Sequence, residues 1–262
     1  MALDLWGSAL VSLGMCGVLC YLAYAKDVLT LDGSVAAFAV GMVIGIFGDV
    51  TWLFLLLFFL LSSFLATRYK FALKEAMGVQ EGVKGERRAS NVLANGIAPM
   101  AAAILSFVNP PWLPRTVSGV VFLSGLAVAG SDTLASEIGV LSPKAYLITS
   151  FKRVTPGTDG GVSVLGQMCA VAAALYTAVV GWFILGDVAR MYGMSMTMPG
   201  LPEVLLVPAV LGFVGCQIDS VIGATLERRG IVNKKTTNLL ATSAGAILAY
   251  AILAVWFPAL MT

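Results

Sequence analysis

Residues 51–67 read TWLFLLLFFLLSSFLAT, an apolar run without a charged side chain. A helix of about 17–25 such residues crosses a hydrocarbon layer about 30 Å thick. Outward from this run, the chain divides into similar apolar segments joined by polar stretches, and we place these segments at 5–25, 31–48, 51–67, 90–108, 116–131, 162–185, 202–218 and 238–259. The sequence therefore predicts an all-α, polytopic transmembrane helix bundle of about eight spans, forming a single transmembrane domain over residues 1–262.

The composition agrees with a membrane protein and excludes several functions. Hydrophobic residues make up 59% of the chain, charged residues make up 11%, and the mean hydropathy is +0.92, whereas soluble domains are about 25% charged. With a net charge of only +2 and no basic arm, we expect no nucleic-acid partner. Histidine is absent, which excludes Ser-His-Asp triads and His-ligated metals, so any metal must be bound by oxygen ligands.

Positive charge is distributed asymmetrically over the joints between segments. If the N-terminus lies outside, every Lys and Arg except Arg115 and Arg190 falls on the inner side. Basic residues favour the cytoplasmic loops of membrane proteins. We therefore expect an integral, multi-pass cell-membrane protein with its N- and C-termini outside and with these cytoplasmic joints: the turn at Lys26, 68–88, 132–161 and 219–237.

The first polar segment on the cytoplasmic side surrounds the start of the fourth span. Arg87 and Arg88 precede this span, and Asn91 and Asn95 share one face of its helix because they are four residues apart. An amide within a membrane helix needs a hydrogen-bonding partner. These residues fit two interpretations, phosphate binding or interfacial arginines with amide contacts between helices.

The second polar segment follows the fifth apolar segment, 116–131, which is the shortest of the set. Its length predicts a broken or re-entrant helix. Asp132 and Ser136 lie one helical turn apart, and Glu137 follows directly. Hydroxyl and carboxylate oxygens that face together suit a hard cation, so we expect Mg²⁺ as the cofactor here.

The third polar segment is FKRVTPGTDGGVS, residues 151–163, which ends where the sixth apolar segment begins. Glycines at a helix N-terminus expose backbone N–H groups that bind anions, and basic side chains add charge-assisted contacts to phosphate oxygens. A plain interfacial turn is the alternative. The candidate phosphate-binding residues in this segment are Lys152, Arg153, Gly157, Thr158, Gly160, Gly161 and Ser163.

The fourth polar segment begins at Asp219, where the seventh apolar segment ends. Ionisable residues near membrane depth are costly and mark functional sites. Ser220, Lys234 and Asn238 supply further polar groups nearby in the sequence. All four segments fall on the same side in this topology. Acidic and basic residues that converge at a water–membrane boundary, without histidine, favour metal-assisted phosphoryl or nucleotidyl transfer.

At these motifs the chain resembles an uncharacterised-domain family of integral membrane proteins that includes vertebrate transmembrane protein 19 and the plant plastid phytyl-phosphate kinase of vitamin E synthesis. The resemblance covers most of the chain and rests on LDGS at 31–34, the exit of the third span at 58–70, VLANG at 92–96, SDTLASEIG at 131–139, PGTDGGVS at 156–163 and DSVIGAT at 219–225. It implies a kinase that transfers the terminal phosphate of a nucleoside triphosphate, with CTP as the family-like donor, to an isoprenyl monophosphate.

The resemblance also suggests a role for each motif. Asp132, Glu137 and Asp219 match its acidic positions, and we assign them as catalytic residues and Mg²⁺ ligands, with Lys152 as a further catalytic residue. The other basic and glycine-rich positions would bind nucleotide and phosphate. Two alternatives use similar ingredients: a CDP-lipid-forming cytidylyltransferase and a membrane transporter. The sequence leaves assembly into a homo-oligomer open.

Overall fold

The computed structural model describes residues 5–188 and 205–261. The predicted outer joint that contains Arg190 and the Met-rich stretch, and the first residues of the seventh predicted span, lie outside the described residues. The elements within these ranges are α1 (Leu5–Ala25), α2 (Leu31–Val43), η1 (Ile44–Gly48), α3 (Val50–Arg68), α4 (Phe71–Ala76), α5 (Ala89–Val108), α6 (Arg115–Gly139), β1 (Ala145–Leu147), β2 (Arg153–Val154), β3 (Gly161–Val162), α7 (Val164–Trp182), η2 (Phe183–Val188), α9 (Val207–Ile222), η4 (Gly223–Glu227), α10 (Lys234–Trp256) and η5 (Pro258–Leu260).

Local side-chain caps explain where several helices begin. The Thr30 side chain accepts a hydrogen bond from the Gly33 N–H, and the Asp49 side chain accepts one from Thr51. Asn233 caps α10 in the same way, accepting from the N–H groups of Lys235 and Thr236. Such caps satisfy N–H groups that have no partner within the helix. They place the helix starts at fixed residues along a chain whose interior is almost uniformly apolar.

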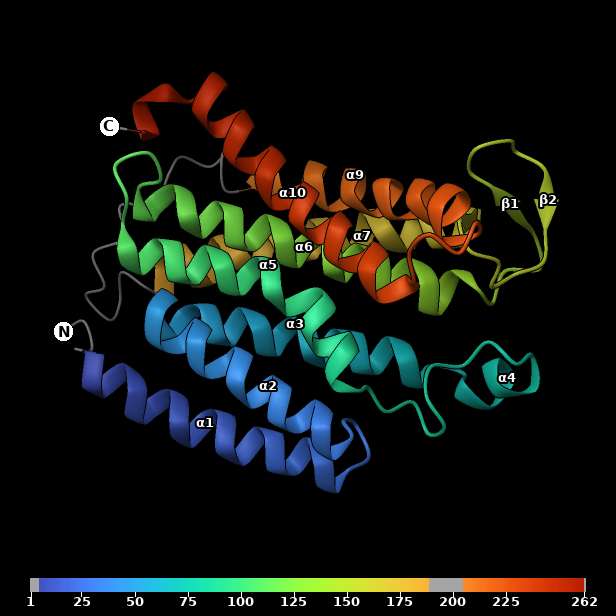
Figure 1. Ribbon diagram of the computed structural model, residues 1–262, viewed down its shortest axis with the longest axis horizontal. Helices are drawn as coiled ribbons and strands as arrows, with labels where there is room; N and C mark the ends of the chain where they lie inside the picture. The colour runs from blue at the N-terminus through green and yellow to red at the C-terminus, as the bar shows by residue number, and fades with distance from the viewer. Residues whose placement is uncertain (1–4, 189–204, 262) are drawn as a thin grey trace.

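The expectation of eight membrane spans is confirmed. In the described part of the chain, eight helices are long and apolar enough to cross a membrane, and they occupy Leu5–Ala25, Leu31–Gly48, Val50–Arg68, Ala89–Val108, Arg115–Gly139, Val164–Gly186, Val207–Glu227 and Lys234–Trp256. The start of α1 and the end of α10 lie at the same end of the bundle, and α4 and the β-strands lie at the other (Figure 1). Both termini therefore share one side, as the charge pattern predicts.

The prediction of a broken fifth helix is wrong. α6 runs without a break from Arg115 to Gly139, so Asp132, Ser136 and Glu137 lie in its last two turns. Polar residues ended the apolar run in the sequence, but in the structure they continue the helix into a polar cavity. The seventh span likewise continues past Asp219 to Glu227, and the eighth begins at Lys234 rather than at residue 238.

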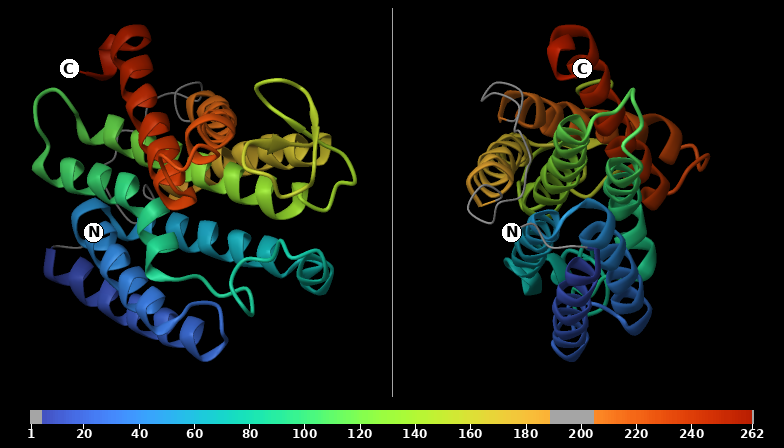
Figure 2. Two further views of the ribbon diagram at one scale, coloured as in Figure 1. Left: turned by 45° about the vertical axis from the view of Figure 1, so that its right-hand side comes forward. Right: turned by 90° about the vertical axis from the view of Figure 1, so that its left-hand side faces the viewer.

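Helix α6 is the centre of the bundle. It packs against α3, α5, α7, α9 and α10, and 89% of its apolar stretch is buried inside the protein; Figure 2 shows it surrounded by the other helices in the end-on view. Small residues permit this packing: a Cβ on Gly139 would lie 2.7 Å from the Gly166 Cα of α7. By contrast, only 11% of α1 is buried.

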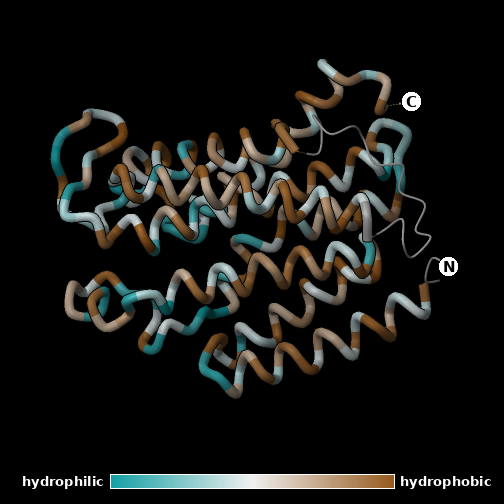
Figure 3. Tube along the Cα trace, turned by 180° about the vertical axis from the view of Figure 1, so that it is seen from behind, coloured by the Kyte–Doolittle hydropathy of each residue, from teal (hydrophilic) through white to brown (hydrophobic). Residues whose placement is uncertain are grey.

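A small sheet that the all-α prediction missed lies between α6 and α7. The strand order is β2-β1-β3, both pairs are antiparallel, and Tyr146 is opposite Arg153 on one side and Val162 on the other. Hydrophilic segments gather at this end of the molecule, around the strands and the neighbouring loops, while the helices are mainly hydrophobic (Figure 3). The sheet holds the 156–163 loop against the ends of α6 and α9.

Candidate functional site

A polar cavity of about 170 Å³ opens at the end of the bundle that carries the sheet. Its walls come from the last turns of α6, the 156–163 loop, the start of α7, the end of α9 with η4, the start of α10 and the loop before α5. The structure thus brings together three of the four polar segments that the sequence indicated. The predicted site residues that line the cavity are Asp132, Glu137, Gly157, Thr158, Gly160, Gly161, Ser163, Asp219, Ser220 and Lys234.

The carboxyl groups of Asp132 on α6 and Asp219 on α9 lie close enough to interact electrostatically with each other. The Oδ2 atom of Asp219 is buried, and it has no hydrogen-bond partner among the described residues. Lys234, at the start of α10, is close enough to interact electrostatically with both carboxyl groups. Lys234 offsets part of the repulsion between the two carboxyl groups, and a bound cation would offset more of it, so this pair is suited to hold one.

The oxygen donors of this pair fit a magnesium ion. Mg²⁺ is commonly bound by one or two carboxylates, with water and substrate phosphates completing its coordination, and not by an all-protein cage. Among residues 5–188 and 205–261, no group of three or more His, Cys, Asp or Glu side chains is arranged to hold a metal.

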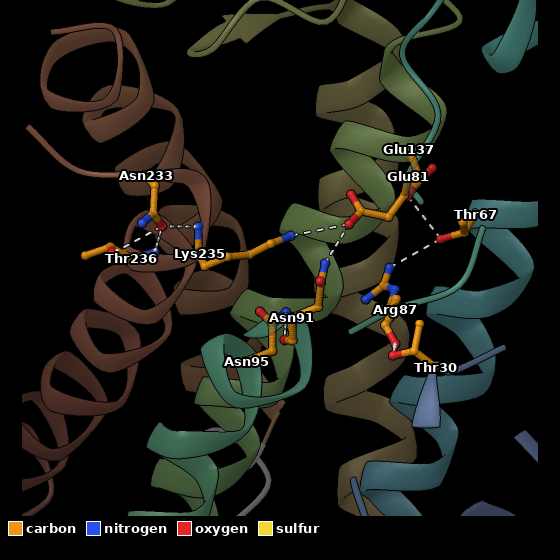
Figure 4. Close-up of polar contacts among 10 residues, drawn as sticks. All are labelled: Thr30, Thr67, Glu81, Arg87, Asn91, Asn95, Glu137, Asn233, Lys235 and Thr236. Carbon is orange, nitrogen blue, oxygen red and sulfur yellow. Dashed lines mark hydrogen bonds and ion pairs between the residues drawn. The ribbon is translucent and has the colours of Figure 1, made fainter. Parts of the chain in front are cut away.

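Glu137 lines the same cavity, but both of its carboxylate oxygens already have partners. Lys74 Nζ donates to Oε2 at 2.7 Å and Thr67 Oγ1 donates to Oε1 at 3.0 Å. Lys74 is fully buried and also donates to the Ala66 and Thr67 carbonyls at the end of α3. Arg87 extends this network by donating to Thr67 Oγ1 at 3.3 Å (Figure 4). Glu137 therefore has the geometry of a buried ion pair, and its expected role as a metal ligand stays a prediction.

Glu81 forms a second polar network beside the cavity. Its Oε1 accepts hydrogen bonds from Asn91 Nδ2 at 2.7 Å and Lys235 Nζ at 3.3 Å, which link α5 and α10 (Figure 4). Burial raises the pKa of Glu81, but Lys235, Lys234, Asn91 and Arg87 outweigh that effect and hold the pKa below its usual value. Glu81 is therefore a carboxylate that keeps its charge under mildly acidic conditions.

The glycine-rich loop is held in place by close packing. Gly160 has a φ of +71°, and a Cβ there would lie 2.3 Å from the Ala224 N atom of η4, so only glycine fits. The N–H groups of Thr158 and Gly161 already donate to Thr155 and Thr158 carbonyls. Ser163 caps α7 through the Gly166 N–H and donates to the Gly139 carbonyl. These contacts fix the shape of the loop and restrict how many of its groups can contact phosphate.

Several predicted residues lie away from the polar cavity. Lys152 and Arg153 are exposed on the β1–β2 hairpin, and Arg88 is exposed before α5. Arg87, Asn91 and Asn95 line a separate apolar cavity. Asn238 is half-buried on α10, and its Oδ1 is buried without a partner among the described residues.

Sequence reasoning missed Lys74, Glu81 and Lys235. Lys74 and Glu81 lie in a joint that looked like a charged linker, and their partners are far away in the chain: Glu137 is 63 positions from Lys74, and Lys235 is 154 positions from Glu81. Lys235 had one available signal, its position directly after Lys234 at the start of a span. Nothing in the sequence distinguishes the buried Lys74 from the exposed lysines around it.

The eight helices and the charged cavity at one end define an integral membrane protein with a membrane-boundary polar site. The chain belongs to the family described as integral membrane protein DUF92, whose profile matches residues 14–253. This assignment confirms the resemblance that the motifs indicated.

Individual relatives cover most of this chain. An uncharacterized membrane protein of Methanocaldococcus jannaschii is 31% identical over 239 residues, which cover 91% of each chain. The chloroplastic protein VTE6 of Arabidopsis thaliana is 30% identical over 227 residues, covering 84% of this chain and 64% of the relative. Protein PGR of the same plant is 29% identical over 226 residues, covering 81% and 77%. No solved structure matches the chain significantly.

Proposed function

We propose that this protein is a prenyl monophosphate kinase, which transfers the terminal phosphoryl group of a nucleoside triphosphate, CTP in the first instance, to a phytyl- or geranylgeranyl-type monophosphate. The observation that carries the proposal is the Asp132–Asp219 pair, which lies beside Lys234 in a polar cavity at the end of a membrane bundle. The family resemblance supplies the substrate class. The positive-inside pattern supports a cytoplasmic orientation of this cavity.

The proposed reaction needs no strong general base from the protein. The acceptor phosphate oxygen is already ionised near neutral pH, so it attacks the terminal phosphorus while the bond to the nucleoside diphosphate breaks. Catalysis then rests on positioning and on charge neutralisation. Asp132 and Asp219 would hold Mg²⁺, which when bound supplies positive charge for the phosphates. Lys234 lies beside this pair and would neutralise phosphate charge directly.

The test is product analysis with detergent-purified protein, Mg²⁺, CTP and geranylgeranyl or phytyl monophosphate, followed by mass spectrometry. Prenyl diphosphate with CDP is the expected result. A CDP-linked lipid with pyrophosphate would show a cytidylyltransferase instead, and no turnover with any nucleoside triphosphate would favour a transporter. For the variants Asp132→Asn and Asp219→Asn in this assay, Asp27→Asn is the matched control, because Asp27 is an exposed acid at the same end of the bundle.

A further inference from the structure

A second, narrow cavity lies between α2, α3 and α5. Its wall is almost entirely apolar and includes Ala37 and Val40 of α2, Leu56 and Phe59 of α3, and Gly96 of α5. Arg87, Asn91 and Asn95 also line the cavity and are its polar lining residues. The cavity therefore combines an apolar wall with a guanidinium group, a combination that suits a ligand with a charged head and an apolar body.

The polar residues of this cavity connect it to the polar cavity that holds the two aspartates. Asn91 lines the apolar cavity and donates to Glu81, which lines the polar cavity. Arg87 lines the apolar cavity and donates to Thr67, which in turn contacts Glu137 in the polar cavity. The two cavities are thus linked by hydrogen-bonded side chains that line one or the other; Figure 4 shows the contacts among these side chains.

Three cations gather at this shared wall. Lys235 is 3.3 Å from Glu81 Oε1, and Lys234 and Arg87 are close enough to act electrostatically on both Glu81 and Lys235. Arg87 and Lys235 are half-buried and Lys234 is exposed. Glu81 and the acids of the polar cavity already face these cations, and a multivalent anion that binds between them would add a further contact to each. This clustering is an observation independent of the cavity shape, and it suits a phosphate.

We propose that the apolar cavity receives the isoprene unit next to the phosphate of the acceptor lipid, while Arg87, Lys235 and Lys234 bind that phosphate at the wall between the cavities. This assignment rests on the proposed kinase function and divides its site in two. The acceptor phosphate then lies beside the Asp132–Asp219 pair, which serves the donor nucleotide. The remainder of the prenyl chain extends towards the bilayer, because the cavity is too narrow to hold it.

Binding of geranyl monophosphate, measured without nucleotide by ligand-induced thermal stabilisation of the full-length protein, tests the assignment apart from turnover. Filling the cavity with Ala37→Val and Ala37→Leu should weaken binding in that order, by about 10-fold or more for Leu, because each added carbon displaces part of the apolar contact of the ligand. Inorganic phosphate, which has no tail, should bind equally to all three proteins. Ala39→Leu is the matched control, because Ala39 is an exposed residue of the same helix.

Arg87→Ala should weaken both geranyl monophosphate and inorganic phosphate, by about 10- to 100-fold, because a charge-assisted contact is lost. If Ala37→Leu binds geranyl monophosphate as well as the unaltered protein does, or if Ala39→Leu weakens it equally, the tail assignment is wrong. If the unaltered protein and its variants bind geranyl monophosphate as expected but none phosphorylates it, the tail assignment stands and the kinase proposal fails. If Ala37→Leu has no melting transition and is therefore unfolded, the binding of geranyl monophosphate to Ala37→Val decides whether the tail assignment is right.

Discussion

Helix α6 carries two acidic positions that look alike in the sequence and differ sharply in the structure. Asp132 faces another carboxyl group, Asp219, whose Oδ2 is buried and unpartnered within the described chain. Glu137 faces Lys74, and both of its oxygens accept hydrogen bonds. An acid whose charge is matched by its own cation contributes to the fold, whereas two facing carboxyl groups that share Lys234 leave room for a further cation. The partner, and not the residue type, decides the role.

The largest effect should come from breaking the matched pair. Lys74→Met leaves Glu137 buried without its cation, and breaking such a pair costs about 3–5 kcal/mol. We expect a marked fall in the melting temperature of the detergent-solubilised protein. The double variant Lys74→Met, Glu137→Gln should recover much of that loss, because the unpaired charge is removed. A double variant no more stable than Lys74→Met would contradict the ion-pair role.

Substitution of Asp132 or Asp219 should lower activity without lowering stability. Asp132→Asn or Asp219→Asn should reduce kcat by about 10²–10³-fold, the range found when one electrostatic contact to a transition state is removed. The melting temperature should stay equal or rise, because like charges no longer face each other. Turnover and melting of each variant, measured over a Mg²⁺ titration, check this. Full activity in either variant would remove that residue from the site.

Glu81 allows a test through pH. Its pKa is lowered overall, so its stabilising contacts are fully present above the unfolded-state pKa of about 4.3 and are lost as the pH falls through the lower folded-state value. Melting temperatures measured from pH 7 down to pH 3 should therefore fall less in Glu81→Gln than in the unaltered protein. Asp27→Asn removes an exposed ion pair with Lys84 and should leave the pH profile unchanged. Identical profiles for Glu81→Gln and the unaltered protein would show that this network does not contribute to stability.

The smallest effect is expected for Lys152→Ala. Lys152 is exposed on the hairpin and does not line the polar cavity, so the free energy of unfolding should change by less than about 0.5 kcal/mol. The sequence alone assigned this residue a catalytic role, which predicts a loss of about 10- to 100-fold. Steady-state kinetics with varied CTP distinguish the two. A large rise in KM would mean that the hairpin reaches the nucleotide.

The sequence predicted the parts of this structure that depend on local patterns. Long apolar runs predict the membrane spans, and the distribution of Lys and Arg predicts which joints lie on the same side. Asp219 is a candidate because charge is costly at membrane depth, and Asp132 is one because it lies one helical turn from Ser136. The continuous α6 and the Lys74–Glu137 pair were missed for one reason: both depend on contacts between distant residues. The last turns of α6 are polar because they line a cavity, and a polar stretch of this kind cannot be told from a loop by its local sequence.

The near-complete enclosure of α6 has a consequence for how the bilayer acts on the site. In a bilayer, lipid would contact α1 and the outer faces of the bundle, whereas protein surrounds the helix that carries Asp132. A thicker or thinner membrane would first tilt the peripheral helices, at a cost of fractions of a kcal/mol per Å of mismatch. Asp219 lies on α9, of whose apolar stretch only 28% is buried, so membrane thickness would act on the acidic pair through α9 and not through α6.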